Sequence, residues 1–329
     1  MQAQAVLFRG VNEVAVEAVE IPAPGPGEVL IQTACSTVSP GTELRCLAGR
    51  QPSPSPWPFI PGYSLSGTIV ACGEAVELAP GTRVFCTGTR RASANLMWGG
   101  HVAYAVAPAV AVFPLPESIP LPAASALHLA AIAFHGLRLA RPLPHEKVVV
   151  LGLGAIGQMS ARLFSAAGAQ VLAIDLTPAR VALARAAGIE AITPDSAIAA
   201  TVHEVLPDGA DIVVDATGAA AVLPQAVASA RELGWDDSPL QGARIVVQGS
   251  YPEDFSIPYQ EAFRKEAHIL VPRDMQPRDV RAVIDLMVRD RLRIDDLLSA
   301  LLPVDQAPAT YARLRSAPDE LVTAVFRWA

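Results

Sequence analysis

The hydrophobic positions divide the chain into three regions with different periods. Residues 1–117 carry short apolar or alternating runs, typical of strands, between turns rich in proline and glycine. Residues 118–271 alternate apolar runs with segments of helical period, which predicts a doubly wound parallel sheet. The tail, residues 272–329, has a helical pattern over Pro277–Arg291 and closes on the β-rich LVTAVFRWA, which has no partner strand nearby in the sequence. We therefore expect an α/β protein whose closing strand returns to the first region.

The clearest chemical signal runs from Lys147 to Asp175. An apolar run at Val148–Leu151 has the β-branched character of a buried parallel strand, and glycines follow it in G-x-G-x-x-G spacing. In this spacing the first glycine permits a tight turn, the second lets a pyrophosphate approach the backbone, and the third lets the helix pack on the strand. A second apolar strand ends at Asp175, whose carboxylate can accept hydrogen bonds from both hydroxyls of a ribose.

The order of strand, glycine turn, helix, strand and acid favours a dinucleotide site over a glycine turn with a purely structural role. The helix N-terminus offers unpaired N–H groups and a partial positive charge to phosphates. The four residues after Asp175 are neutral and Arg180 is the first base, which predicts NAD(H) rather than NADP(H), with Arg180 at most flanking the adenine. The predicted cofactor contacts are Gly152, Gly154, Ala155, Ile156, Gly157, Asp175, Arg180, Ala216, Thr217, Gly218, Gly249, Ser250 and Tyr251.

Composition narrows the class of protein further. The 329 residues suggest two domains, and 51 % hydrophobic against 17 % charged residues suffice for large buried cores. The net charge of −7, without any basic stripe, argues against nucleic acid and anionic membranes as partners. No apolar run reaches the roughly twenty residues of a membrane span, and the N-terminus lacks a signal-peptide pattern. The four cysteines show no C-x-x-C spacing, so we expect free thiols in a reducing compartment, the cytoplasm.

Several motifs together resemble the medium-chain dehydrogenase/reductase superfamily over essentially the whole chain. They are PGPGEVLIQ at 24–32, GTEL at 41–44, PFIPGYSLSGTIVACG at 58–73, PGTRV at 80–84, VVVLGLGAIG at 148–157, DIVVDATG at 211–218 and the final AVFRW. The resemblance implies a GroES-like, β-rich catalytic domain formed by residues 1–117 and 272–329, with a Rossmann domain at 118–271. It also implies a homodimer or a homotetramer.

The resemblance breaks at the zinc ligands. Zinc-dependent members carry a catalytic cysteine in the loop that matches Ser36–Leu44, and a Gly-His-Glu where this chain has Gly62-Tyr63-Ser64. Ser39 or Pro40 falls at the cysteine position, and only the third ligand position keeps an imidazole, His128. Catalytic zinc needs three protein ligands, and the cysteine lobe that binds structural zinc is missing as well, so we predict a zinc-free protein. The GTEL and PGY segments look most like the branch that contains bacteriochlorophyllide a dehydrogenase, which oxidises a hydroxyethyl side chain on a large planar ring.

Hydride transfer without zinc needs hydrogen-bond donors for the substrate oxygen. Thr42 matches a position where zinc members keep a hydroxyl that touches this oxygen, although a turn hydroxyl bonded to its own backbone is the alternative. Tyr63 replaces a metal ligand and would act as a donor, or else as a wall of the pocket. His128 would face the same site, or else be a satisfied core histidine. We expect structural roles for the histidines at 101, 135, 145 and 268.

Five further residues are assigned to the substrate pocket by the resemblance: Glu43, Trp57, Leu96, Met97 and Trp98. The aromatic and apolar members of this set indicate an apolar or aromatic small-molecule substrate, although they could equally anchor their loops. Glu43 would orient His128 or form a salt bridge, and the salt bridge is favoured.

Three functions are open at this point. The first is an NAD(H)-dependent, zinc-independent oxidoreductase that interconverts a bulky, mostly apolar secondary alcohol and its ketone. The second is an enoyl or quinone reductase of the same superfamily, against which Asp175 counts because such enzymes usually prefer NADPH. The third is a non-catalytic nucleotide-binding protein.

Overall fold

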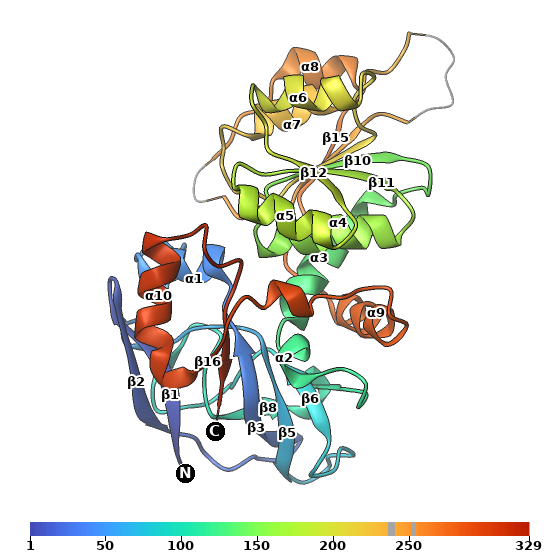
Figure 1. The fold of residues 1–329 in the computed structure, drawn as a ribbon. Coiled ribbons are helices and arrows are strands. Elements are labelled where there is room, and N and C mark those ends of the chain that lie inside the picture. Colours follow the sequence, from blue (N-terminus) through green and yellow to red (C-terminus); the bar gives the residue numbers. More distant parts are fainter. Residues whose placement is uncertain (236–240, 252–253, 329) are drawn as a thin grey trace. The chain divides into compact units, whose positions relative to one another are not determined.

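The chain forms two compact units in the computed structural model, which describes residues 1–235, 241–251 and 254–328 (Figure 1). Unit 1 comprises Met1–Leu129 and Val280–Ala329, and unit 2 comprises Ala130–Asp279. These boundaries lie later in the chain than the predicted ones at 117 and 271, because each falls inside a helix rather than in a connection. The helices are α3 (Leu127–Ala140) and α9 (Pro277–Val288).

Unit 1 is built from two sheets. The smaller has the order β2 (Glu13–Glu20), β1 (Gln2–Gly10), β4 (Phe59–Ile60) and β7 (Asn95–Leu96). The larger has the order β16 (Leu301–Pro303), β17 (Val325–Arg327), β3 (Glu28–Thr37), β5 (Leu65–Cys72), β6 (Arg83–Cys86) and β9 (Phe113–Pro114), and β8 (Tyr104–Pro108) also pairs with β3. Strand β8 begins at Tyr104, so that His101 lies in the loop that precedes it.

The end of the chain joins the larger sheet of unit 1, next to a strand from the N-terminal part of the sequence. Strand β17 pairs antiparallel with β3, in the register Phe326↔Ser36, which confirms the expected return of the closing segment. Helix α10 (Ala307–Ser316) precedes it and contributes Tyr311 to a core that also contains Phe8 and Phe59. Burial of these large side chains ties the two ends of the chain together.

The GTEL segment lies in a short helix, α1 (Pro40–Leu47), rather than in an open loop. Pro40 occupies the first helical turn, where the missing N–H of proline costs no hydrogen bond. The remaining short elements of unit 1 are α2 (Leu121–Ala124), η1 (Ala109–Ala111), η2 (Asp295–Leu297) and η3 (Val304–Gln306). Because α1 begins next to Ser39, its N-terminus fixes the positions of Ser39 and Thr42.

Unit 2 is a six-stranded parallel sheet, as the alternating pattern predicts. The order is β12 (Glu190–Ile192), β11 (Gln170–Ile174), β10 (Lys147–Leu151), β13 (Ile212–Asp215), β14 (Arg244–Val247) and β15 (His268–Leu270). The chain order reverses between β10 and β13, which is where sheets of this kind bind ligands.

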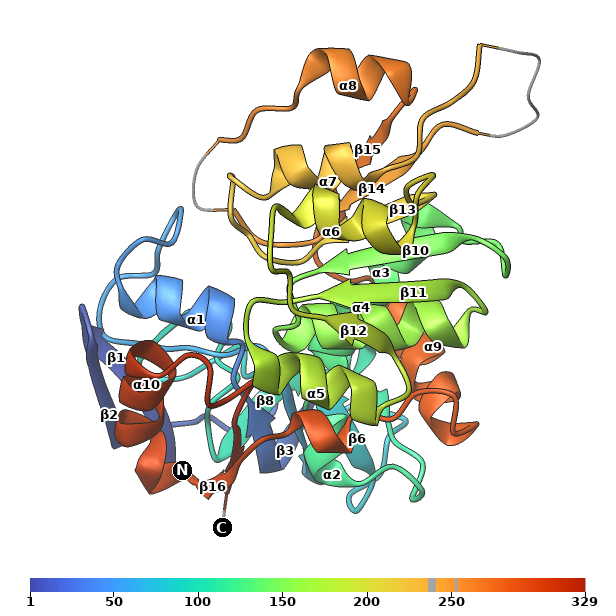
Figure 2. The ribbon, with the colours of Figure 1, turned by 45° about the horizontal axis from the view of Figure 1, so that its top comes forward.

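Helices cover both faces of this sheet (Figures 1 and 2). One face carries α3, α4 (Ala155–Ala166) and α5 (Pro178–Ala186), and the other carries α6 (Ile198–Val205), α7 (Leu223–Ser229) and α8 (Tyr259–Arg264). Alternate residues of the central strand serve the two faces: Val148 and Val150 pack in the core on the α4 side, and Val149 and Leu151 in the core on the α7 side. Burial on both faces explains the continuous apolar run in the sequence.

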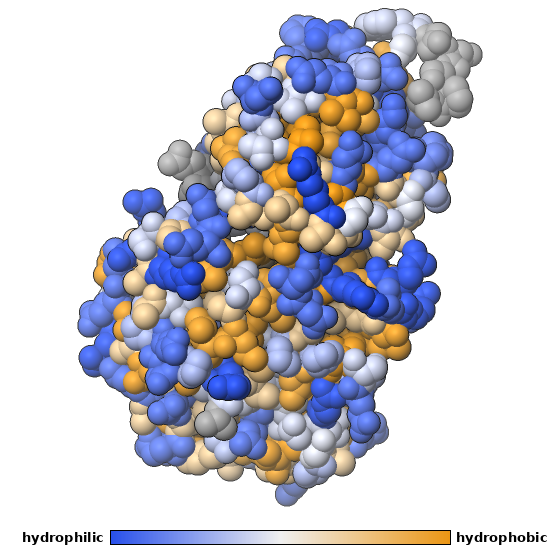
Figure 3. Space-filling view, viewed as in Figure 1, coloured by the Kyte–Doolittle hydropathy of each residue, from blue (hydrophilic) through white to orange (hydrophobic). Residues whose placement is uncertain are grey.

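Hydrophilic residues cover much of each unit on the face drawn in Figure 3, with hydrophobic residues showing between them. All four cysteines are free thiols. None of the helices that the structure describes has both the length and the apolar character of a membrane span.

Candidate active site

The glycine turn of unit 2 is shaped by close backbone packing. Gly152 has φ +85°, and a Cβ at this position would lie 2.8 Å from Cγ2 of Thr217. A Cβ at Gly157 would overlap the carbonyl oxygen of Gly152, so that helix α4 can approach the turn only without a side chain there. Gly154, in contrast, has nothing within 4 Å of an added Cβ and is the N-cap of α4. The open backbone beside Gly154 fits the approach of a pyrophosphate to the helix N-terminus.

Asp175 lies beside this turn with its carboxylate already oriented. Its Oδ2 accepts a hydrogen bond from the backbone N–H of Leu153 at 2.6 Å, and its Oδ1 accepts one from Thr177 at 2.7 Å. Arg180, one turn into α5, places Nη1 3.8 Å from Oδ2 of Asp175. The sequence suggested that Arg180 would at most flank the adenine. In the structure its guanidinium instead lies beside the carboxylate of Asp175.

Two loops complete the rim of the sheet at the ends of β13 and β14. The buried carboxylate of Asp215 holds both, since its Oδ1 accepts hydrogen bonds from the N–H and the hydroxyl of Thr217 at 2.9 and 2.6 Å. The backbone N–H of Gly249 donates to the Asp215 carbonyl at 2.8 Å. Predicted cofactor residues from four separate segments, at 152–157, 175, 216–218 and 249–251, thus lie along one edge of the sheet.

Tyr251 also belongs to this arrangement, but its hydroxyl group is engaged. The hydroxyl donates a hydrogen bond to Oδ2 of Asp215. Burial and the neighbouring Asp215 carboxylate raise the pKa of Tyr251. Asp215 was not among the predicted site residues, although an acid directly after a buried apolar strand was a visible signal for it.

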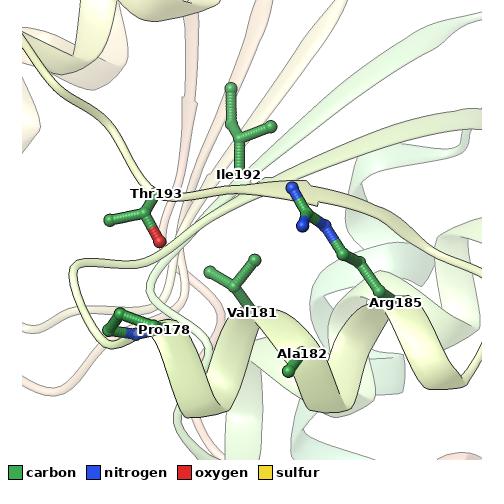
Figure 4. Close-up of a pocket in the computed structure, with 6 residues that line it drawn as sticks. All are labelled: Pro178, Val181, Ala182, Arg185, Ile192 and Thr193. Carbon is green, nitrogen blue, oxygen red and sulfur yellow. The ribbon is translucent and has the colours of Figure 1, made fainter.

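A pocket of unit 2 opens beside helix α5 (Figure 4). It is lined by Pro178, Val181, Ala182, Arg185, Ile192 and Thr193. Val181 on α5 points toward the end of β12, and the Arg185 side chain is held by a hydrogen bond from its Nε to the carbonyl of Ala191 at 2.7 Å. The lining of this pocket mixes aliphatic side chains with the polar Arg185 and Thr193, and it begins at Pro178, three residues after Asp175 in the chain.

Unit 1 brings three hydroxyl groups together. Tyr63 donates a hydrogen bond to Oγ of Ser39 at 2.5 Å, and its oxygen lies 3.4 Å from Oγ1 of Thr42. Ser39 and Tyr63 are the residues that the resemblance places at two zinc-ligand positions, and they are in direct contact. Ser39 was weighed only as the replacement of a ligand, and its hydroxyl as a partner of Tyr63 was missed.

Two rings flank Tyr63. The His128 ring lies 4.6 Å from the Tyr63 ring between centroids, and the indole of Trp98 lies 5.3 Å away, edge-on at 89°. His128 projects from α3, whose start is anchored through Ser125, which bonds to Thr37 at 2.6 Å. Trp98 adopts φ +71°, a left-handed conformation that is costly for a bulky residue and is found mainly where the surroundings enforce it. Thr42, Tyr63, His128 and Trp98 thus form one cluster.

Glu43 lies in the interior of unit 1, an environment that differs from the pocket position that the resemblance implies. Its side chain is fully buried, and it contacts His101 rather than His128, with 2.9 Å between Oε2 and Nε2. Tyr311 donates a second hydrogen bond to Oε2, and the backbone N–H of Ser39 donates to Oε1 at 2.7 Å. The favoured interpretation was a salt bridge; the structure gives Glu43 the partner His101, which was not foreseen and forms an ion pair only when its ring is protonated.

Three other predicted pocket residues, Trp57, Leu96 and Met97, pack on neighbouring side chains of unit 1. Trp57 stacks on Phe59 with 4.7 Å between ring centroids, and Met97 is buried in the same core. Leu96 pairs with Ile60 in the short β7–β4 contact and packs on the other core. Their aromatic and apolar character therefore reflects packing within unit 1.

The donor set at the hydroxyl cluster does not suit zinc. Zinc sites use thiolate, imidazole and carboxylate ligands, whereas a phenol and a serine hydroxyl stand at two of the three expected positions. Within the part of the chain that the structure describes, no three histidine, cysteine, aspartate or glutamate side chains gather as a metal site.

Comparison with known proteins agrees with both units. Residues 25–117 match the alcohol dehydrogenase GroES-like domain family, and residues 155–289 match the zinc-binding dehydrogenase family. The second match begins after Tyr63 and His128, so it does not include the ligand positions. A 2-desacetyl-2-hydroxyethyl bacteriochlorophyllide A dehydrogenase from Cereibacter sphaeroides is 27 % identical over 329 residues, covering 97 % of this chain and 96 % of that protein.

Solved structures share the fold. A short-chain alcohol dehydrogenase from Escherichia coli CFT073, complexed with NADH, superposes with a TM-score of 0.86 at 20 % identity over 99 % of both chains. A protein from Sinorhizobium meliloti 1021, described as a zinc-binding dehydrogenase and bound to NADP, gives 0.86 at 24 % identity, again over 99 % of both. At these identities the likeness concerns the fold alone.

Proposed function

Because the chain belongs to the medium-chain dehydrogenase/reductase superfamily, as an oxidoreductase of the alcohol dehydrogenase type with a nicotinamide cofactor, we propose that it interconverts a bulky, mostly apolar secondary alcohol and its ketone without zinc. One observation carries the proposal. Where zinc members hold a metal, this chain has the phenol of Tyr63 bonded to Ser39, with Thr42 within reach.

These hydroxyls can do the work that the metal would otherwise do. A bound nicotinamide would accept the hydride from the carbinol carbon or return it to the ketone. In the direction of reduction the carbonyl oxygen gains a proton as the hydride arrives; the phenol of Tyr63 can donate it and regain one from the hydroxyl of Ser39, and oxidation runs the same transfers in reverse. Thr42, at 3.4 Å from Tyr63, provides a second hydroxyl through which the proton can pass. The rings of His128 and Trp98 restrict the phenol to one orientation.

The residues of unit 2 fit NAD(H). The open backbone at Gly154 suits the pyrophosphate, and Asp175, already oriented by Leu153 and Thr177, has further lone pairs for the ribose hydroxyls. In the pocket beside α5, the aliphatic side chains of Val181 and Ile192 could contact a purine base, and Thr193 adds a hydroxyl group. These features support NAD(H) as the cofactor that we propose.

A second function is favoured by one observation. Nη1 of Arg180 lies 3.8 Å from Oδ2 of Asp175, and the guanidinium could donate hydrogen bonds to the 2′-phosphate of NADPH. Enoyl and quinone reductases of this superfamily usually prefer NADPH, so we keep reduction of an activated double bond as the alternative.

The test is turnover of a panel with either cofactor. The panel contains 1-phenylethanol and acetophenone, larger aryl ketones, enones and quinones. We expect oxidation and reduction at the secondary alcohol and ketone, and a loss of roughly 10²-fold in kcat for Tyr63→Phe and for His128→Ala, with the Kd for NADH unchanged. Tyr104→Phe, in strand β8 and the other core, is the matched control. Activity confined to enones or quinones would favour the alternative, and normal turnover in both variants would remove the proton role of Tyr63 and His128.

We also propose a homodimer or a homotetramer in the cytoplasm, acting on a small molecule and not on nucleic acid or a membrane. The absence of a basic stripe from a chain with net charge −7 and the four free cysteines support this assignment. Sedimentation of the purified protein at several concentrations tests the assembly, and a stable monomer would refute it.

A further inference from the structure

We propose that Glu43 and Tyr311 are positioning residues that hold Ser39, and through it the phenol of Tyr63, so that the C-terminal helix α10 sets the geometry of the proton site. The inference rests on the proposed function, because it concerns the same phenol. It gives Tyr311 a role that no motif assigns, and it gives Glu43 a role that differs from orienting His128.

The first step is the unusual start of helix α1. Ser39 is the N-cap residue of α1. The hydroxyl oxygen of an N-cap serine normally accepts a hydrogen bond from a backbone N–H of the first turn. Here the Ser39 side chain makes no capping bond, and the cap is closed from the other direction by Glu43, whose Oε1 accepts the N–H of Ser39 at 2.7 Å. The Ser39 hydroxyl is thereby left to accept the hydrogen bond of Tyr63 at 2.5 Å.

The second step is what fixes Glu43. A carboxylate that is 0 % exposed is costly unless its oxygens are satisfied by donors. Tyr311, His101 and the Ser39 N–H supply three hydrogen bonds, and the two side chains converge on the same oxygen, Oε2. The Tyr311 hydroxyl reaches Glu43 across 268 residues of sequence, from the middle of α10.

A second branch of the same hydrogen-bond network comes from the end of the chain. The Trp328 indole donates to Oγ of Ser36 at 2.9 Å, and Ser36 bonds to Nδ1 of His101 at 2.7 Å. With its proton on Nε2, His101 can accept from Ser36 and donate to Glu43, so every link is satisfied. Burial and the charge of Glu43 hold the pKa of Tyr311 well above its usual range, so that the phenol keeps its proton for this bond. The C-terminal segment therefore reaches the proton site through Glu43 and Ser39.

The kinetic test combines two substitutions, with acetophenone and NADH as the probe. Tyr311→Phe removes one hydrogen bond to a carboxylate, and we expect a fall of roughly tenfold in kcat, with KM changed less than about twofold. In the Tyr63→Phe background the same substitution should lower kcat no further, because its effect passes through the phenol. Equal losses in both backgrounds would overturn the inference while leaving the proposed function intact. A normal kcat for Tyr63→Phe itself would instead refute the proton role that the proposed function gives to Tyr63, on which this inference rests.

A second measurement needs no turnover. The chain has five tyrosines, so protein labelled with 3-fluorotyrosine should give five ¹⁹F resonances, and Tyr63→Phe assigns one of them. Tyr311→Phe and Glu43→Gln should both move the Tyr63 resonance, whereas the control Tyr104→Phe should only remove its own. A Tyr63 resonance that stays in place in Tyr311→Phe, which deletes a single oxygen from a folded core, would overturn the proposal.

Discussion

The discrimination between NADH and NADPH depends on two opposite charges that lie together at the ribose end of the proposed cofactor site. Asp175 would face the ribose hydroxyls, and a 2′-phosphate in their place would meet its carboxylate. Arg180, with Nη1 3.8 Å from that carboxylate, would attract the same phosphate. The preference of the protein is therefore a difference between a repulsion and an attraction.

The size of each effect follows from the geometry. Two unit charges about 4 Å apart interact with about 4 kcal/mol near a protein surface, where the effective dielectric constant is about 20. The side chains of Asp175 and Arg180 are 7 % and 22 % exposed, so solvent screens the acid less than the base. If Arg180 offsets about a third of the repulsion, roughly 2.7 kcal/mol remains, which corresponds to about 10²-fold tighter binding of NADH.

Titration calorimetry with NADH and NADPH on four variants measures this balance directly, without a substrate. We expect a ratio of about 10² for the wild type, about 10³ for Arg180→Ala, and a ratio near one for the double variant. Asp175→Ser alone should reverse the preference, because it leaves Arg180 with the phosphate. If the ratio of the wild type is near one and Asp175→Ser does not change it, the carboxylate does not face the ribose, and the enoyl-reductase alternative gains.

The remaining predictions concern the metal, the glycine turn and alkaline stability. Elemental analysis of the purified protein should find far less than one zinc per chain, and chelators should leave the activity unchanged. Stoichiometric zinc would refute the prediction that the protein is zinc-free. Gly157→Ala should abolish binding of NADH and cost about 1–3 kcal/mol of stability, since its Cβ would overlap the Gly152 carbonyl oxygen, whereas Gly41→Ala, with open space around it, should do neither. Tyr251 and Tyr311 have raised pKa values through burial and their carboxylate neighbours, so their contribution to stability is complete below the ordinary tyrosine pKa of about 10 and is lost as the pH rises above it. Urea unfolding between pH 8 and about 11 should show this loss, and Tyr251→Phe should make the decline shallower; an unchanged slope would contradict the assignment.

The cofactor unit was accessible from the sequence because its signals are local. The turn at Gly152 and the tight helix approach at Gly157 are demands on single residues, and a parallel strand buried on both faces has a recognisable composition. Arg180 was not accessible in the same way. Its distance from Asp175 depends on the direction in which α5 leaves the loop, and residue spacing does not report that direction.

The catalytic unit shows the opposite case. Replacement of the zinc ligands by Tyr63 was visible in the motif, but nothing in the sequence indicates that its hydroxyl is bonded to Ser39. For the same reason the sequence does not separate Trp98, whose ring contacts Tyr63, from the other aromatic and apolar residues assigned to the pocket. A tryptophan such as Trp57 has the same local signature whether it stacks on a neighbour in the core or faces a ligand.

By itself, the sequence determined the two kinds of domain, the glycine turn and the loss of two ligands, since each depends on residue type and spacing over a few turns of chain. Only the tertiary structure decided that Glu43 accepts hydrogen bonds from Ser39 and Tyr311. It also decided that the boundaries between the two units fall inside helices, and that Arg180 lies beside Asp175. The physical reason is that a buried polar group must find its partners wherever packing brings them. Tyr311 lies 268 residues from the carboxylate that it satisfies, and no local period records such a contact.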